Sequence, residues 1–132
     1  MSTLTSTDLT VTDANVTNLK DASGGEASTP AEINSGRAKY WCTFQGTGTA
    51  AILDSFNSAG FSDSGTGIYA LTIDTDFDSA NFVATGSVTN STRGVVAIDG
   101  MATGGFNVNT REGHTGTATD YGKVSVVAFG DQ

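Results

Sequence analysis

The sequence predicts an all-β protein: an antiparallel β-sandwich of the jelly-roll or Greek-key type, preceded by an extended N-terminal arm. Threonine, valine and isoleucine make up 36 of the 132 residues, and β-branched side chains fit a pleated, half-buried strand better than a helix. From residue 37 onward, glycine and aspartate bound short apolar runs about every 8 to 12 residues, a spacing typical of sandwiches and barrels. The predicted domains are therefore an arm over 1–36 and a β-sandwich over 37–132.

The predicted arm contains no aromatic residue and too few large apolar residues to build a core of its own. Leu9 and Val11 alternate with polar residues, as do Ala14 and Val16. This pattern predicts two short strands or one extended segment with a bulge. We expect these four residues to dock the arm by strand addition to a sheet edge, with pairing to the chain's own sheet as the alternative.

Two local signals follow within the arm. Residues 23–28, SGGEAS, predict a flexible loop. Thr29 suits the N-cap of a helix, Pro30 suits the first helical position, and Glu32 lies three residues after the cap. The sequence therefore predicts a short helical turn near 30–35 that opens with a capping box.

The rest of the chain predicts eight strands separated by glycine- and aspartate-rich turns. Residues 64–67, SGTG, predict a hairpin loop in which glycine supplies positive φ. Residues 49–60 allow a helix as an alternative, because their apolar residues also fall at helical spacing. The strands are expected near 38–45, 49–56, 59–63, 67–74, 82–89, 93–99, 105–111 and 121–129.

In the last predicted strand, 121–129, most residues on each of the two faces are apolar. Val124, Val126 and Ala128 on one face alternate with Ser125, Val127 and Phe129 on the other. Such a pattern predicts a strand that is buried on both faces.

The charge and the rare residues exclude several functional classes. Only 6 basic residues accompany 14 acidic ones, giving a net charge of −8, which argues against nucleic acid and anionic membranes as partners. One cysteine and one histidine cannot form an intramolecular disulfide or a cysteine-rich zinc site, and they leave few options for general base catalysis. The start of the chain has no signal-peptide pattern, and no apolar stretch is long enough to span a membrane. We expect no enzymatic activity and no cofactor.

Residues 46–51, GTGTAA, partly match the glycine-rich fingerprint of dinucleotide-binding folds. Asp74 ends a later predicted strand, near where such folds place a ribose-binding acid. The match fails further along, because residues 82–132 show strand periodicity rather than the helices of further βαβ units. We therefore expect a plain hairpin turn at 46–51 and no nucleotide binding.

Asp74, Asp76 and Asp78 alternate as at the start of a calcium-binding loop. The positions that should then hold glycine and glutamate are Ser79 and Thr85. A solvated acidic turn is therefore expected, with the three aspartates as the only metal candidates.

Two further residues invite a chemical interpretation. His114 could pair with Asp120 and a nearby serine, but no nucleophile motif accompanies it, so a histidine in an exposed loop over 112–120 is expected. Cys42 lies on a predicted strand without an activating neighbour in the sequence, and we expect it to be a small buried side chain.

The most specific sequence signal is a series of short motifs in the β-domain. Residues 36–52 read GRAKYWCTFQGTGTAAI, followed by DSFN at 54–57, GTGIY at 65–69, DSANF at 78–82 and KVSVVAFG at 123–130. This series resembles the small β-domains of bacteriophage virion surface proteins, the tail-fibre-like and decoration proteins of environmental and marine phages. The resemblance covers residues 36–130, and NLKDASGG at 18–25 resembles the same proteins more loosely.

The resemblance implies a non-enzymatic structural role on a virion assembled in the cytoplasm of a host bacterium, commonly as a homotrimer. A capsid decoration (cement) or head-spike protein is the first expectation, because 132 residues cannot supply the long shaft of a fibre. The alternative is a short tail-fibre or tail-tip protein that binds a host-surface receptor or glycan, with Trp41 or Tyr69 stacking on a sugar ring. The expected partners are further copies of this chain, major capsid or tail proteins and, in the alternative, a glycan.

The composition favours association between copies independently of the resemblance. Valine, isoleucine, leucine and phenylalanine number 27 of 132 residues, near the lower limit for a stable core. Burying apolar surface between copies would contribute about 25 cal/mol per Å². A polysaccharide hydrolase, the third class considered, would need two opposed carboxylates in a cleft, whereas the acidic residues lie mostly in predicted turns.

Overall fold

The computed structural model describes residues 19–20, 24–89 and 93–132. Contacts divide the chain between Ile33 and Asn34 into an N-terminal unit and a β-domain. Within the described residues, no helix has the length and apolar character needed to cross a bilayer. The residues predicted to dock the arm lie outside the described part of the chain: Leu9, Val11, Ala14 and Val16.

The N-terminal unit contains a small antiparallel sheet of β1 (Leu19–Lys20) and β2 (Glu26–Ser28). The prediction of a loop throughout 23–28 is therefore wrong in its second half, which forms β2. Gly24, with a φ of 84°, takes the left-handed conformation in the connection before β2. The composition of residues 26–28 does not indicate a strand, and they form one because their backbone pairs with β1.

The helix α1 (Pro30–Gly36) confirms the predicted helical turn. The Thr29 backbone N–H donates to Glu32 Oε2 at 2.7 Å, and the Glu32 backbone N–H donates to Thr29 Oγ1 at 3.2 Å. These are the two reciprocal bonds of the predicted capping box. The bond from the Thr29 backbone stabilises the carboxylate and holds the pKa of Glu32 below its ordinary value.

The described part of the β-domain contains eight strands, each at a position where the sequence predicts one. Their alternating burial follows from side chains that point to opposite faces along a strand. The strands are β3 (Ala38–Gln45), β4 (Ala51–Phe56), β5 (Ser58–Gly65), β6 (Ile68–Ile73), β7 (Val83–Val88), β8 (Gly94–Ala102), β9 (Gly105–Glu112) and β10 (Val124–Phe129).

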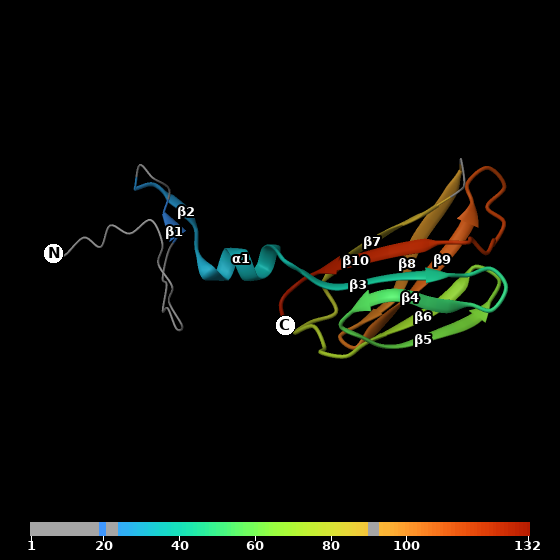
Figure 1. Ribbon diagram of the computed structural model, residues 1–132, viewed down its shortest axis with the longest axis horizontal. Helices are drawn as coiled ribbons and strands as arrows, with labels where there is room; N and C mark the ends of the chain where they lie inside the picture. The colour runs from blue at the N-terminus through green and yellow to red at the C-terminus, as the bar shows by residue number, and fades with distance from the viewer. Residues whose placement is uncertain (1–18, 21–23, 90–92) are drawn as a thin grey trace. The chain divides into compact units, whose positions relative to one another are not determined.

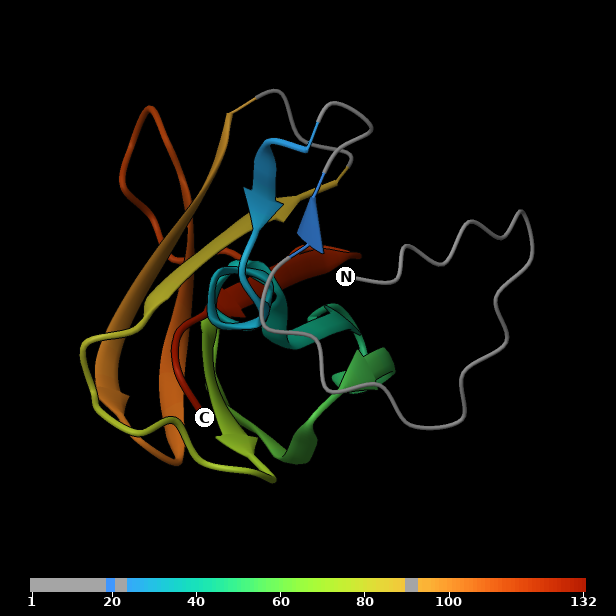
Figure 2. The same cartoon turned by 90° about the vertical axis from the view of Figure 1, so that its left-hand side faces the viewer.

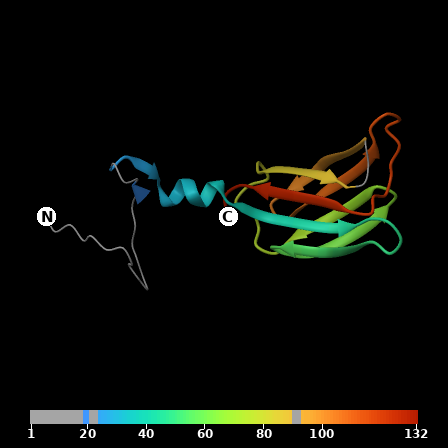
Figure 3. The same ribbon diagram turned by 45° about the horizontal axis from the view of Figure 1, so that its top comes forward.

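These strands form two four-stranded antiparallel sheets, β4-β3-β10-β7 and β5-β6-β9-β8. Figures 1 and 3 show β3 (teal) and β10 (red) side by side in one layer. Figure 2 shows β8 and β9 (orange) on the other side of the domain from β3 and β4. This arrangement confirms the predicted antiparallel β-sandwich, in which β10 returns to pair with the first strand of the domain.

The core lies between the two sheets and is rich in aromatic rings. The Phe44 and Tyr69 ring centroids, one from each sheet, are 4.8 Å apart. Phe77 and Phe82, from the connection between β6 and β7, stack at 4.1 Å. Aromatic pairs at these separations add to the stability that burial of their area provides. The core therefore joins the sheets into one body.

β10 is buried on one face and not on both, so this prediction is wrong. Val124, Val126 and Ala128 are buried in the core, whereas Val127 is half-buried and Phe129 is exposed. The reason is that the sandwich has two layers, so each strand has a single inward face. The outward apolar residues of β10 therefore lie on the surface of the domain.

The alternative of a helix over 49–60 is also wrong. β4 and β5 occupy this segment, with Asn57 between them at a φ of 60°. Ile52 packs against the core, while Leu53 and Phe56 are exposed. The apolar residues of β4 lie on both of its faces, Ile52 opposite the buried Phe44 and Phe56 opposite the exposed Trp41, so their spacing does not follow the period of a strand with one apolar face.

Candidate functional site

The outer face of the sheet β4-β3-β10-β7 carries a group of large apolar side chains. The register places Val127 of β10 opposite Trp41 of β3, and Trp41 opposite Phe56 of β4. In the neighbouring row, Phe129 of β10 lies opposite Val83 of β7. Paired residues share a face of the sheet. We call this group the outer apolar patch: Trp41, Phe56, Val83, Val127 and Phe129.

The outer apolar patch is well exposed. The exposed fractions are 66% for Val83, 51% for Phe56, 37% for Phe129 and 36% for Trp41. Single exposed apolar residues are ordinary, but a contiguous group on one face marks an interaction surface. This patch is therefore the strongest candidate functional feature of the β-domain.

The outer face of the other sheet is polar, which sets the two faces apart. Asn109 of β9 donates a hydrogen bond to Asp99 of β8 at 2.8 Å. The exposed apolar residues of this sheet lie opposite polar ones, Ile68 opposite Asn109 and Val95 opposite Arg111. Among the strands that the structure describes, the sheet β4-β3-β10-β7 thus presents neighbouring apolar side chains from all four of its members, and the other sheet does not.

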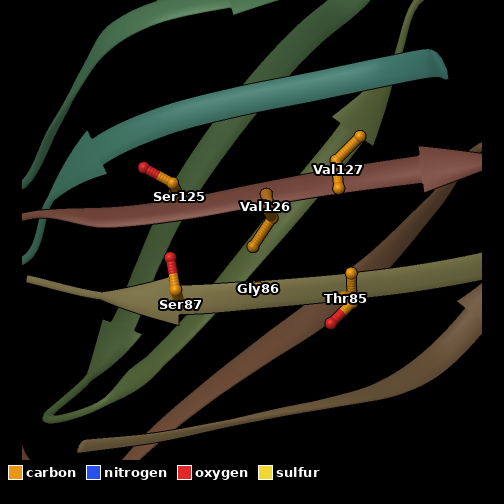
Figure 4. A pocket seen from close by; sticks show the side chains of 6 residues that line it. All are labelled: Thr85, Gly86, Ser87, Ser125, Val126 and Val127. Carbon is orange, nitrogen blue, oxygen red and sulfur yellow. The ribbon is translucent and has the colours of Figure 1, made fainter.

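A shallow groove of about 280 Å³ adjoins the outer apolar patch between β7 and β10. Figure 4 shows Ser87 and Ser125 across from each other on the two strands, with Thr85 and Val127 further along. The small side chains of the serines leave room on this part of the sheet. Because Val127 belongs to both features, a molecule that covers the patch could also place a side chain in the groove.

The four edge strands of the sandwich are β4, β5, β7 and β8, and they differ in how open they are to pairing. Asp54, Asp63 and Asp99 lie on β4, β5 and β8, and each of these strands pairs with its neighbour through a register shift. β7 has no charged residue and pairs with β10 without a shift. Charges and bulges discourage strand addition, so β7 is the edge best suited to accept another strand.

The three aspartates considered as calcium ligands, Asp74, Asp76 and Asp78, lie exposed between β6 and β7. The Asp74 backbone N–H donates to the Asn57 carbonyl, and that of Asp78 donates to the Asp131 carbonyl. Among residues 19–20, 24–89 and 93–132, no three His, Cys, Asp or Glu side chains are grouped to hold a metal ion. The three aspartates therefore lie at the surface of an irregular connection between two strands.

Residues 46–51 connect β3 to β4, which run antiparallel. Gly48 takes a φ of 69° in this connection, a conformation that glycine adopts without strain. A dinucleotide fingerprint requires strand, turn and helix in succession. Residues 46–50 instead form the turn between two antiparallel strands, and Ala51 begins β4.

Asp120 is engaged by the core rather than by His114. Asp120 Oδ1 accepts hydrogen bonds from the Tyr69 hydroxyl at 2.7 Å and from the Gly67 backbone N–H at 2.6 Å. Burial, with the Asp120 carboxylate beside it, raises the pKa of Tyr69. The His114 backbone N–H donates to Glu112 within the same loop. The hypothetical pairing of His114 with Asp120 is therefore replaced by a structural role for Asp120.

The two residues predicted to contact a receptor are separated by the structure. Tyr69 is fully buried, so its prediction as a contact residue is wrong. Trp41 lies in the outer apolar patch. The other members of the patch were not predicted from the sequence, although the run of apolar residues at 126–129 was a signal for Val127 and Phe129.

Cys42 is expected to react slowly with thiol reagents in the folded protein. Its side chain is fully buried in the core, and burial raises the pKa of the thiol, which lowers the thiolate fraction available for attack. We expect negligible labelling by a chromogenic disulfide in buffer and rapid labelling of one thiol per chain in denaturant. Rapid labelling of the native protein would contradict this placement.

Comparisons with protein-family models, with curated proteins and with solved structures find no match to this chain. The features of this chain that bear on function are the motifs over 36–130, the outer apolar patch and the open edge of β7.

Proposed function

We propose that this chain is a non-enzymatic structural protein of a bacteriophage virion, a homotrimeric capsid decoration or head-spike protein. The observation that carries the proposal is the series of motifs over 36–130, which resembles small β-domains of phage surface proteins. A compact sandwich with one polar and one partly apolar outer face suits this role, because it can present one face to solvent while the other is covered. The protein would assemble onto virions in the bacterial cytoplasm.

The N-terminal arm supplies the proposed attachment to a neighbouring subunit or to the shell. Leu9, Val11, Ala14 and Val16 have the alternation of an added strand. The edge of β7, which has no charged residue and no register shift, is the kind of edge that can accept such a strand. In strand addition, main-chain hydrogen bonds provide affinity and alternate side chains provide specificity.

Deleting residues 2–28 is expected to leave the β-domain folded and to abolish incorporation into particles. The reason is that both sheets and the core lie within residues 38–129. Circular dichroism with thermal melting would measure folding, and co-sedimentation with particles that lack this protein would measure binding. A truncated chain that is unfolded would indicate that the arm completes its own sheet, and a folded one that still binds fully would contradict docking.

Point variants in the full chain provide a matched control for the arm. Leu9→Asp with Val11→Asp places two charges on the alternating apolar side, whereas Thr10→Asp with Thr12→Asp places the same charges on the other side. We expect the first pair to prevent binding to particles and the second pair to retain most of it. Equal loss in both pairs would indicate charge repulsion rather than strand addition.

Electron cryomicroscopy of the parent particle tests the location directly. The proposal predicts density for an eight-stranded sandwich at regularly repeated positions on the capsid surface. Density at the tail tip would support the receptor-binding alternative. Particles without this chain would overturn both.

The alternative, a tail-tip protein that binds a host-surface glycan, is favoured by one observation, the exposed indole of Trp41. Aromatic faces stack on sugar rings, so titration with host-surface polysaccharide should then quench Trp41 fluorescence. The decoration proposal predicts no quenching. Trp41→Ala would serve as the control for signals that do not come from this residue.

A further inference from the structure

We infer that the outer apolar patch is the surface through which copies of this chain assemble. The inference rests on the homotrimer of the proposed function and names the surface that forms it. It does not require that the protein belong to a virion, so the two can be tested separately.

The area of the patch matches the centre of a stable interface. The exposed fractions of the four most exposed patch residues correspond to a surface on the order of 400 Å². Stable interfaces bury about 800 Å² per partner, with an apolar centre and a polar rim. The adjoining row supplies such a rim, since the Thr43 and Ser125 hydroxyls lie 3.2 Å apart on the same face. The patch is thus large enough for the centre but too small to be the whole interface.

The charge distribution favours a second copy over a different partner. Residues 34–132 contain nine acidic and five basic residues, so two β-domains repel each other over most of their surfaces. The outer apolar patch itself contains no charged side chain, and Asp54, the acidic residue of β4 on this face, lies opposite Thr43 in the adjoining row, at the rim rather than in the centre. A basic partner would instead bind the acidic parts of the surface.

The groove between β7 and β10 gives this surface a recess into which a side chain of a neighbouring copy can fit. Its small residues, Thr85, Ser87 and Ser125, leave a recess beside Val127. In an assembly, a large side chain of the neighbouring copy can enter this recess, and such filled pockets contribute much of the binding energy of interfaces.

Trp41 permits a test without any substitution, because it is the chain's single tryptophan. Sedimentation velocity would follow assembly between about 1 and 100 µM, where weak and moderate complexes dissociate, and fluorescence would be recorded on the same samples. We expect the Trp41 emission to shift to longer wavelength and acrylamide quenching to increase as the oligomer dissociates. A chain that stays monomeric throughout, or a Trp41 signal that does not change on dissociation, would overturn the inference.

Substitutions with a matched control test the surface itself. Phe56→Lys and Val83→Lys each place a charge in the patch, while Ile68→Lys and Val95→Lys place the same charge at exposed apolar positions of the other sheet. We expect the patch variants to weaken association at least about thirtyfold, as for a central interface residue, and the controls to change it less than about threefold. Association that is unaffected by the patch variants, or equally weakened in all four, would overturn the inference.

Two further controls address misfolding of the lysine variants and coverage of the patch by the N-terminal arm. Val83→Thr and Val95→Thr preserve shape, so they retain the comparison if a lysine variant does not fold. Deletion of residues 2–28 distinguishes a second copy from coverage by the arm, because the inference predicts that the truncated chain still assembles. A truncated chain that is monomeric would assign assembly to the arm and overturn the inference, whether or not the protein is found on virions.

Discussion

Gly67→Ala is expected to lower the melting temperature of the β-domain by about 20 °C, corresponding to about 4 kcal/mol of unfolding free energy. Gly67 has a φ of 67°, which alanine adopts at a cost of about 1 to 2 kcal/mol. An added Cβ would also overlap the Thr110 carbonyl oxygen and lie 2.9 Å from the Thr119 backbone nitrogen. These two backbone atoms are hydrogen-bonded to each other at 3.1 Å, so moving either of them away from an added Cβ would strain this bond.

Gly48→Ala is the matched control for this substitution. Gly48 has nearly the same φ, 69°, but a Cβ there would meet no atom within 4 Å. It therefore isolates the cost of the left-handed backbone, about 1 kcal/mol or 6 °C. Thermal unfolding followed by circular dichroism measures both variants. If the two variants melt at the same temperature, the close approach at Gly67 does not contribute to stability.

The strand pattern could be predicted from the sequence because each strand has one inward face. In β3, Tyr40, Cys42 and Phe44 alternate with outward residues, and all three are buried as the period of two requires. The capping box of α1 could be predicted for a similar reason, since Thr29 and Glu32 contact each other locally. Both features depend on residues that are close together in the chain.

Which face of a strand points into the core could not be predicted in the same way. In β10, residues of both faces are apolar, and only the pairing of β10 with β3 and β7 determines that Phe129 and Val127 lie outside. Likewise, Tyr69 and Trp41 are both aromatic residues on strands, yet Tyr69 lies in the core and Trp41 on the surface. The outer apolar patch therefore became identifiable only once the two sheets were in register.

The glycine pattern gives a second example of this difference. A turn at 64–67 could be predicted from its composition, and Gly65 and Gly67 do take positive φ there, 133° and 67°. The contact between Gly67 and Thr110 joins residues far apart in the chain, so nothing near Gly67 in the sequence indicates it. For this reason Gly67 and Gly48 look equivalent in the sequence but are not equivalent in the structure.

Asn57→Ala is the second substitution for which we expect a large effect, a loss of about 3 to 4 kcal/mol of unfolding free energy. Asn57 Nδ2 donates to the Lys39 carbonyl at 2.9 Å and to the Thr75 carbonyl at 3.0 Å, and Oδ1 accepts from the Thr75 N–H at 2.7 Å. Each such bond contributes about 0.5 to 1.5 kcal/mol. The φ of 60° at Asn57 is a further cost for alanine, because asparagine tolerates the left-handed region better.

Asn57 connects β4 of one sheet to β5 of the other. Two comparison variants separate the contribution of its side-chain hydrogen bonds from that of its backbone conformation. Asn57→Gly removes the side-chain bonds but keeps the backbone conformation accessible, so it should cost about 1 kcal/mol less than Asn57→Ala. Asn109→Ala removes an exposed bond to Asp99 and should cost less than about 1 kcal/mol. Urea unfolding of the three variants measures these differences. If Asn57→Ala were no more destabilising than Asn109→Ala, the hydrogen bonds of Asn57 would not stabilise the connection between β4 and β5. The association of the two sheets would then depend on the core alone.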